Sequence, residues 1–435
     1  MKNRLISSLQ AVGVIYISLW ITPANGQKPT VKAIPDPYAK EISTLTQNKS
    51  VIEAFSIIDQ LEPLTRKEHI ELTEIPAPPF HEAVRAQRYK QLLEAAGPHA
   101  VWLDSLGNVL LLRKGKKGDR TVVLDAHLDT VFPEGTDVKV RVKGDTLFAP
   151  GISDDTRGLI AMLTVFRAME KANIQTNDNV LFVASLGEEG LGDVRGTRFV
   201  VKKNKIDSWI SIDGTEIEEI VNGALGSVRY RVIVKGPGGH SWGAFGLGNP
   251  HHAMARGMNY FVQAATPFTG SGPKTSFNVG TMGGGTSVNS IPFESWAEVD
   301  MRSESPVQLK KIDSLFRVSM KRGLDEYNAT IQKGPLLSLD LKLLGFRPSG
   351  ATSGDSPLIH RTMAAATHFN RMPRLGIQST NANIPISNGI PAVTIGAGGR
   401  SNKEHSLGEW WLNDRGADGI KFALLVLLGE VGIAR

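Results

Sequence analysis

The chain contains no cysteine among its 435 residues. This absence excludes disulfide scaffolds, thiolate-bound zinc and thiol catalysis, so any metal ion must be bound by histidine and carboxylate side chains. No run of basic residues concentrates the formal charge of +6, and we therefore expect no nucleic-acid partner. The content of 41% hydrophobic and 21% charged residues is typical of a globular protein, and the length suffices for two to three domains.

The N-terminal residues have the pattern of a secretory signal peptide. Lys2 and Arg4 precede an apolar run from Leu5 to Ile21, which is followed by the small-residue stretch Ala24-Asn25-Gly26. A membrane anchor is the alternative, but the run is short for a full span and polar residues interrupt it, so we predict cleavage after about Gly26. Cysteine is absent as a lipoprotein anchor, and no later segment has a membrane-spanning length of apolar residues. We expect a periplasmic or secreted protein of charge +4, without membrane contact once residues 1–26 are removed.

Short apolar runs of β type alternate with helical patterns in two stretches of the chain, which predicts an α/β fold: a mainly parallel, mixed sheet flanked by helices. We assign residues 27–225 and 336–435 to the two parts of one catalytic domain. Between them, residues 226–335 have the order strand–helix–strand–strand–helix–strand, with the last short strand at Thr330–Gln332. This order is that of an inserted ferredoxin-like α+β domain.

Residues that can bind metals or move protons follow the predicted strands 121–126, 180–185, 208–212 and 392–395, or precede the predicted helix at 156–169. They are His127, Asp129, Asp154, Glu188, Glu189, Asp213 and His405. Open α/β sheets bind ligands at the carboxyl ends of their strands, so we expect these side chains to meet in one cleft. Each short motif alone is more often structural or solvent-exposed than catalytic. Together they predict a site.

Several carboxylates gathered in one cleft repel one another, and two divalent cations would remove that repulsion. The number of acids and imidazoles fits two metal ions about 3.5–4 Å apart, the spacing of two-metal hydrolytic sites. One carboxylate must then bridge both ions, and a spare glutamate can act as general base on a water and pass the proton to a leaving amine. The residues therefore favour hydrolysis of an amide bond.

The same segments resemble the co-catalytic zinc exopeptidase and deacylase family, which includes peptidase T, folate-cleaving glutamate carboxypeptidases, aminoacylase and acetylornithine deacetylase. The resemblance spans roughly residues 75–410, in family order, and is closest to the peptidase T-like branch. The matching segments are VVLDAHLDTV (122–131), GISDDTRG (151–158), SLGEEGLGD (185–193), ISIDGTE (210–216), GPGGHSWG (236–243), SVNSIP (287–292) and IPAVTIGAGG…EHS (390–406). The resemblance implies the zinc-exopeptidase fold, a phosphorylase/hydrolase-like mixed sheet with an inserted lid and dimerisation domain.

The resemblance also implies a role for each residue of the cleft. His127 and Asp213 would bind one zinc ion, Glu189 and His405 the other, and Asp154 would bridge the two. Glu188 would be the general base, and Asp129 would orient His127. The family often has a cis peptide bond after its bridging aspartate, here Asp154-Asp155. Because most ligand atoms are oxygens, Co²⁺ or Mn²⁺ can substitute for Zn²⁺.

The inserted domain matches the family's lid, which implies a homodimer. His240 resembles the lid histidine that crosses to the partner's site and stabilises the tetrahedral intermediate, and Asn289 resembles a lid residue that contacts substrate. Arg302 is a candidate anion clamp, although a strand-end arginine is more often a surface residue.

The sequence departs from its relatives in two segments. Thr380-Asn381-Ala382-Asn383 has asparagine where many relatives have aspartate, a change expected to affect loop structure or specificity rather than zinc binding. Lys333-Gly334-Pro335 stands where carboxypeptidase-like members have arginine before proline to bind the substrate carboxylate. This departure disfavours a strict carboxypeptidase.

Three functions remain open at this stage. The leading one is a secreted di-zinc metallopeptidase acting on short peptides. The second is a deacylase or amidohydrolase that releases an amino acid from an N-acyl or N-carbamoyl derivative by the same site chemistry. The third is a catalytically inactive binding module on this fold, which would be expected to have lost Glu188 or a zinc ligand; here all of these positions are filled.

Overall fold

The computed structural model describes residues 34–434, which belong to one compact unit. The predicted signal peptide, residues 1–26, lies outside the described residues. None of the helices in the described part combines the length and the apolar composition needed to cross a bilayer.

The larger sheet has nine strands and is mixed, as predicted. In spatial order the strands are β1 (Val101–Leu103), β2 (Val109–Arg113), β6 (Asn179–Ser185), β3 (Thr121–His127), β7 (Ser208–Ile212), β17 (Ala392–Ile395), β8 (Glu219–Ala224) and β15 (Gly350–Ala351), with β16 (Arg374–Gln378) paired to β8. The central strands β6, β3, β7 and β17 are parallel, whereas β2 runs antiparallel to β6 and β8 antiparallel to β17. The parallel strands therefore end at one edge of the sheet.

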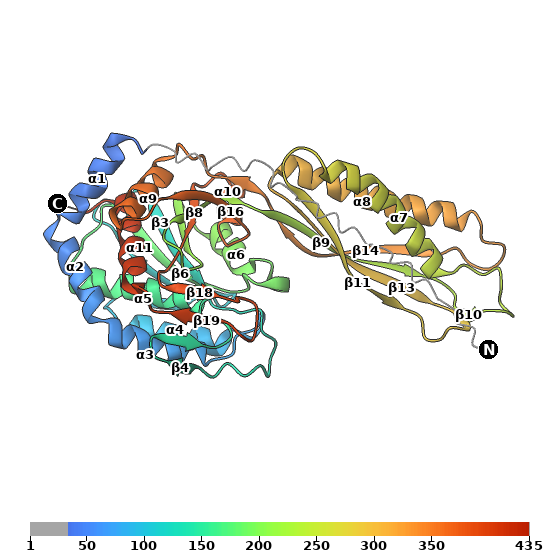
Figure 1. The fold of residues 1–435 in the computed structure, drawn as a ribbon, viewed down its shortest axis with the longest axis horizontal. Helices are drawn as coiled ribbons and strands as arrows, with labels where there is room; N and C mark the ends of the chain where they lie inside the picture. Colours follow the sequence, from blue (N-terminus) through green and yellow to red (C-terminus); the bar gives the residue numbers. More distant parts are fainter. Residues whose placement is uncertain (1–33, 435) are drawn as a thin grey trace, which may run out of the picture. The chain divides into compact units, whose positions relative to one another are not determined.

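Helices cover both faces of this sheet (Figure 1). One face packs against α1 (Asp36–Thr46), α2 (Lys49–Gln60), α3 (Glu62–Thr73), α4 (Ala83–Glu94), α5 (Thr156–Lys171), α9 (Pro357–His368) and α11 (Gly416–Val431), and the other against α6 (Arg195–Lys203) and α10 (Asn383–Ser387). Alternate residues of β3 divide between the two cores: Val122 and Leu124 face the first, and Val123 faces the second. A strand buried on both faces explains the continuous apolar run that predicted it.

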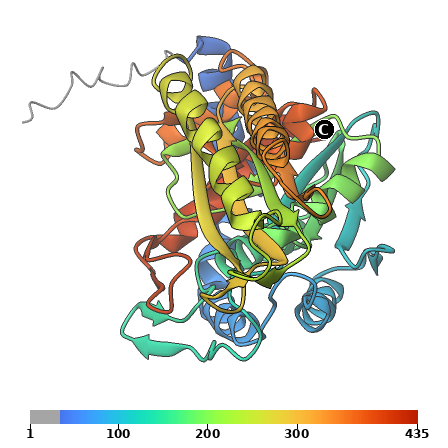
Figure 2. The ribbon, with the colours of Figure 1, turned by 90° about the vertical axis from the view of Figure 1, so that its right-hand side faces the viewer.

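The inserted part forms a four-stranded antiparallel sheet of its own, in the spatial order β11-β13-β9-β14. Along the chain its elements are β9 (Gly226–Lys235), α7 (Pro250–Thr269), β11 (Thr275–Gly284), β13 (Glu294–Ser303), α8 (Pro306–Asn328) and β14 (Ser338–Arg347). The two helices lie side by side on one face of the strands (Figures 1 and 2). Val228, Val232 and Val234 alternate into the core beneath them. The short strands β10 (Gly239–His240) and β12 (Ser290–Ile291) pair separately.

The prediction of a last short strand at Thr330–Gln332 is wrong. These residues form no strand, and the fourth strand is β14, so the inserted sheet continues to Arg347. The turn residues Gly334 and Pro335 come before the strand, and Gly334 has a positive φ of 80°. The real signal was the alternation of Leu339, Leu341 and Leu343 with polar residues, a pattern typical of a half-exposed strand.

A second small sheet carries one of the predicted site residues. It consists of β4 (Arg141–Lys143), β5 (Thr146–Phe148), β18 (Arg400–Asn402) and β19 (Trp410–Leu412). His405 lies in the loop between β18 and β19, with a left-handed φ of 61°. A single-turn 3-10 helix, η1 (Gly190–Gly192), directly follows Glu189.

Candidate active site

Main-chain topology brings the predicted cleft residues to one edge of the larger sheet. His127 is the last residue of β3, and Asp213 directly follows the adjacent strand β7. Glu188 and Glu189 follow β6, the neighbour of β3 on its other side. Because β3, β6 and β7 are parallel, all of these residues leave the sheet at the same edge.

The side chains converge on Asp154, whose two oxygens face different histidines. Its Oδ1 lies 3.0 Å from Nε2 of His127, and its Oδ2 lies 3.0 Å from Nε2 of His405. Nε2 of His405 also lies 2.9 Å from Oε1 of Glu189. Ligand atoms of His127, Asp154 and Glu189 all lie within 4.8 Å of one another. Asp154 therefore occupies the position of a group shared between two centres.

Burial and crowding make this cluster electrostatically costly for the protein groups alone. Burial and the nearby charge of Asp154 raise the pKa of Glu189 to about 7, and the same two causes raise the pKa of Asp213 well above its usual range. Hydrogen bonds to Asp154 and Glu189 raise the pKa of His405 to about 11. The acids thus resist ionisation while the imidazole holds a proton. Divalent cations would replace that proton and neutralise the carboxylates.

The chemistry of the donor groups fits such cations. Imidazole nitrogens and carboxylate oxygens are the ligands that zinc binds in the absence of thiolates. Asp213 lines the same cavity as Asp154 and His405, so it adds a carboxylate to the set. Two histidines, two terminal carboxylates and one central carboxylate give each of two ions ligands of its own plus a shared one.

The support behind His127 differs in detail from the prediction. Nδ1 of His127 donates to the main-chain carbonyl of Asp129 at 3.0 Å, whereas the nearest carboxylate oxygen of Asp129 is 3.7 Å away. The Asp129 carboxylate instead accepts the main-chain N–H groups of Glu188 and Glu189, at 2.9 and 2.8 Å. Asp129 thereby fixes the tautomer of one imidazole and the position of the neighbouring glutamate pair.

Glu409, which no sequence motif indicated, is a buried residue that holds the Asp154 loop. Its carboxylate accepts the main-chain N–H groups of Gly151, Ser153 and Asp154 at 2.8 to 3.1 Å. Burial raises the pKa of Glu409 to about 7. The following peptide bond, Asp154-Asp155, is cis, as the resemblance implied. The only indication of Glu409 in the sequence was its position four residues after His405.

Arg347 was also missed, and it contacts the predicted general base. Nη1 of this buried arginine donates to Oε1 of Glu188 at 2.6 Å and to the Ser379 hydroxyl at 3.0 Å, while its Nε has no partner among the described residues. Arg347 is the last residue of β14 and precedes Pro348. The arginine–proline pair expected from the resemblance is therefore present. The comparison with Lys333-Gly334-Pro335 was wrong because it relied on the misplaced last strand.

Two cavities open on the cluster. The first, of about 380 Å³, is lined by Asp154, Glu188, Glu189, Asp213 and His405 and also by three arginines, Arg229, Arg302 and Arg347. The second, of about 490 Å³, shares Asp154, Asp213 and His405 and has Glu216, Glu219 and Glu404 in its wall. Basic side chains thus lie on one side of the cluster and acidic ones on the other.

Two of the three predicted substrate-binding residues do not line these cavities. His240 accepts the main-chain N–H groups of Trp242 and Gly243 at its Nδ1, and Asn289 accepts a hydrogen bond from the Ser287 hydroxyl. Arg302 does line the first cavity. The structure therefore groups Arg302 with the cluster and leaves His240 and Asn289 on the β10–β12 part of the inserted domain.

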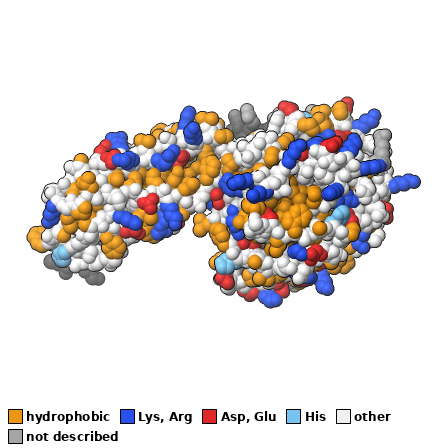
Figure 3. All heavy atoms as spheres, turned by 180° about the vertical axis from the view of Figure 1, so that it is seen from behind, with side chains coloured by type: hydrophobic (Ala, Val, Ile, Leu, Met, Phe, Trp, Pro, Cys, Tyr) orange, Lys and Arg blue, Asp and Glu red, His pale blue; other side chains and the backbone are white. Residues whose placement is uncertain are grey.

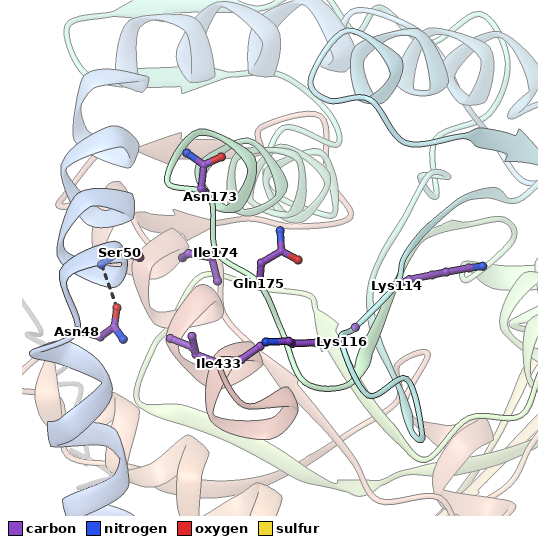
Figure 4. A pocket seen from close by; sticks show the side chains of 10 residues that line it. Asn48, Ser50, Lys114, Lys116, Asn173, Ile174, Gln175 and Ile433 are labelled. Atoms are coloured by element: carbon purple, nitrogen blue, oxygen red, sulfur yellow. Dashed lines mark hydrogen bonds between the residues drawn. The ribbon is translucent and has the colours of Figure 1, made fainter.

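Another cavity, of about 510 Å³, lies between the start of α2, the segment after β2 and the C-terminal residues (Figure 4). Asn48 in its wall accepts the main-chain N–H of Ser50 as the cap of α2, and Lys114 and Lys116 belong to the opposite wall. No imidazole or carboxylate lines this cavity among the described residues. It therefore lacks the imidazole and carboxylate ligands of a metal site.

The comparison with protein families agrees with this geometry. Residues 123–428 match the model of peptidase family M20/M25/M40, which covers more than half of the chain. The chain belongs to this family. It is accordingly a metal-dependent hydrolase of amide bonds, and the dinuclear metal binding of M20 enzymes matches the donor cluster around Asp154.

Individual M20 relatives differ in their substrates. The chain is 26% identical over 333 residues to succinyl-diaminopimelate desuccinylase from Hahella chejuensis, covering 71% of this chain and 82% of the relative. It is 23% identical over 287 residues to the cytosol non-specific dipeptidase of Escherichia coli, covering 58% and 56%. Aminopeptidase PepT from Bacillus cereus shares the fold, with a TM-score of 0.68 and 19% identity over 84% of this chain and 97% of that structure.

Proposed function

We propose that this M20 enzyme is a secreted di-zinc metallopeptidase that hydrolyses the amide bonds of short peptides. The single observation that carries the proposal is the placement of Asp154, with one oxygen toward His127 and the other toward His405 and Glu189. In this assignment His127 and Asp213 bind one ion, Glu189 and His405 bind the other, and Asp154 bridges them. Two zinc ions would polarise the scissile carbonyl and acidify a water molecule.

Glu188 is the general base in this proposal. It lines the cavity beside the ligands without being one of them, and the hydrogen bond from Arg347 holds its Oε1 in place. Its carboxylate takes a proton from the attacking water and gives it to the nitrogen of the leaving amine. The Asp129 carboxylate keeps the Glu188 and Glu189 main chain fixed during this transfer.

The walls of the two cavities support a peptide over an acyl amino acid as the substrate. A short peptide carries a C-terminal carboxylate and an N-terminal ammonium group at its two ends. The arginine side of the cluster suits the carboxylate, and the side with Glu216, Glu219 and Glu404 suits the ammonium. An N-acyl or N-carbamoyl amino acid has only the carboxylate and would leave the acidic side without a partner.

Steady-state hydrolysis of matched substrates by the zinc-loaded enzyme tests this choice. We expect turnover of Ala-Ala and Ala-Ala-Ala with little turnover of N-acetyl-alanine and N-carbamoyl-alanine. Hydrolysis of the acyl and carbamoyl compounds alone would assign the deacylase function instead. Zinc binding without turnover of any of the four would favour a binding module.

We also propose that the enzyme acts as a homodimer through the inserted domain. Trp242, Phe245 and Val288 are more than 70% exposed around β10 and β12, and His240 and Asn289 lie in the same part. Figure 3 shows further hydrophobic side chains exposed among basic ones on one face of the inserted domain. A partner's His240 would complete the site. Sedimentation of wild-type protein and of a Trp242→Ser/Phe245→Ser variant tests the dimer, which the variant should weaken.

The proposed place of action is the periplasm or the medium, with residues 1–26 as a cleaved signal peptide. This assignment depends on the sequence pattern of Lys2, Arg4 and the apolar run after them. Expression of the full chain in a bacterium, followed by fractionation and N-terminal sequencing, tests it. A start near Gln27 in the periplasmic fraction is expected, and an uncleaved cytoplasmic chain would contradict it.

A further inference from the structure

The arginines of the first cavity all lie on one face of the inserted sheet, near the strand ends that meet the catalytic domain. Arg302 in β13 and Arg347 in β14 both pair with Ser227 of β9, one from each side. Directly opposed residues of neighbouring strands point to the same face. The two arginines therefore lie on either side of the small Ser227, on strands about 10 Å apart. Arg229 follows Ser227 by two residues and shares this face.

Arg229 and Arg302 share a single carboxylate. Nε of Arg229 donates to Oδ1 of Asp300 at 2.9 Å, and Nε of Arg302 donates to Oδ2 of the same residue at 2.7 Å. Nη1 of Arg229 reaches the carbonyl of Gly190, next to Glu189. Among residues 34–434 no hydrogen-bond partner meets the Nη groups of Arg302. One aspartate thus positions two guanidinium groups through their Nε atoms. The Nη donors of Arg302 remain available to a ligand.

The charges around the cavity do not balance without an anionic substrate. Two divalent cations would more than neutralise their ligand acids Asp154, Glu189 and Asp213, and Glu188 pairs with Arg347. Arg229 and Arg302 then share Asp300, which leaves one positive charge on this pair. Gly345 stands opposite Arg229 on the other side of β9, and the Asp193 carboxylate, which pairs with Arg198, lies beside it. One substrate carboxylate would neutralise this charge.

We propose, resting on the peptidase function above, that Arg229 and Arg302 form a second anion subsite, which selects substrates with an acidic side chain next to the free carboxylate. Arg347 takes the C-terminal carboxylate, and the Arg229–Asp300–Arg302 group takes the side-chain carboxylate of a C-terminal aspartate or glutamate. The preferred substrates are therefore short peptides that end in an acidic residue.

The test compares isosteric substrates that differ only in this charge, Ala-Ala-Glu and Ala-Ala-Gln. We expect the wild-type enzyme to prefer the glutamate peptide by about tenfold in kcat/KM, since two partly exposed ion pairs contribute roughly up to fivefold each. Arg229→Gln and Arg302→Gln should each lower this ratio toward one. The matched control is Arg231→Gln: Arg231 lies on the same face, pairs with Glu298 at 2.9 Å and does not line the cavity, so the ratio should stay at its wild-type value.

A binding measurement separates failure of this inference from failure of the peptidase function. Calorimetry of the zinc-loaded protein with free glutamate and free glutamine needs no turnover. Tighter binding of glutamate that is lost in Arg229→Gln and Arg302→Gln supports the subsite even if no peptide is cleaved. Equal binding of the two amino acids, or peptide hydrolysis with a wild-type ratio near one, overturns the subsite while leaving the peptidase function intact.

Discussion

Arg347 donates a hydrogen bond of 2.6 Å from Nη1 to Oε1 of Glu188, across 159 residues of sequence. Both side chains are nearly inaccessible, with exposed fractions of 6% and 5%. The bond joins the end of β14 in the inserted sheet to the turn after β6 in the larger sheet. The proposed general base is therefore positioned by a residue of the inserted domain.

Replacing Glu188 with glutamine should abolish turnover and leave metal content nearly unchanged. The amide keeps the shape of the side chain but cannot accept the proton, so we expect kcat to fall by about 10²–10⁴-fold, the range of a lost general base. Steady-state kinetics and metal analysis by plasma mass spectrometry check both parts. Glu68→Gln is the control, because Glu68 is a buried partner of Arg167 outside the cavity. An active Glu188→Gln enzyme would show that the base is misassigned.

His405→Ala should lower metal occupancy. The imidazole faces both Asp154 and Glu189, so its loss removes a ligand beside the shared carboxylate. We expect bound zinc to fall from about two ions per chain to about one, because the ion assigned to His127 and Asp213 keeps its ligands. His368→Ala, at the exposed end of α9, should retain both ions. Full occupancy in His405→Ala would remove His405 from the ligand set.

Removal of the metal ions should destabilise the fold. Without cations, the buried Glu189 and the half-buried Asp154 and Asp213 repel one another, and ligands that bind only the folded state add about 2.7 kcal/mol at a hundredfold excess over Kd. Thermal unfolding with EDTA and after zinc is restored measures the difference, and the unfolding temperature should fall and recover. The shift should be smaller in His405→Ala. An unfolding temperature that EDTA does not change would argue against a cation at this cluster.

The buried His69 predicts a loss of stability in mild acid. Burial, helped by the charge of Arg157, lowers the pKa of His69 to about 3, and its Nε2 donates to the carbonyl of Ile152. As pH falls below about 6.5, His69 becomes protonated in the unfolded chain but stays neutral in the folded chain. The stability that neutral His69 contributes is therefore present above pH 6.5 and is lost as pH falls from 6.5 toward 3.

Urea unfolding of wild type and His69→Gln at pH 7.5 and pH 5.5 measures this contribution. From the higher to the lower pH the wild type should lose about 1.4 kcal/mol more than the variant, because only its histidine takes up the proton on unfolding. Equal losses in the two proteins would mean that His69 titrates normally.

Asp125 and Asn381 should show a charge-swap rescue. The buried Asp125 carboxylate accepts hydrogen bonds from Trp209, Ser211 and Asn381 at 2.5 to 2.6 Å. In Asp125→Asn the new amide N–H group faces side chains that are themselves hydrogen-bond donors. This substitution should cost about 1–3 kcal/mol of unfolding free energy. Adding Asn381→Asp restores one carboxylate to the pair and should recover much of that loss, measured as a double-mutant cycle in urea. Purely additive losses would deny the coupling.

The sequence predicted most of the catalytic domain because its strands are buried on both faces and its helices are amphipathic. The helix α11 was not predicted: Gly416–Val431 is almost wholly buried, so it has no polar stripe to reveal its period. The cluster around Asp154 was predicted from motifs at strand ends. Glu409 and Arg347 were not, because their partners are main-chain groups and a side chain far away in sequence, which only the fold brings together.

The three arginine positions lie within the first residue pairs of the inserted sheet, whereas His240 and Asn289 lie beyond Lys235 and before Glu294. If both proposals hold, the preference for substrate charge and the contribution of a partner subunit would be encoded in separate stretches of one insertion. Replacing residues 236–293 with those of a relative should exchange the segment that contains His240 and Asn289. The preference of this enzyme for substrate charge should persist. Under these proposals, substitutions at three codons would change substrate recognition independently of the proposed dimer.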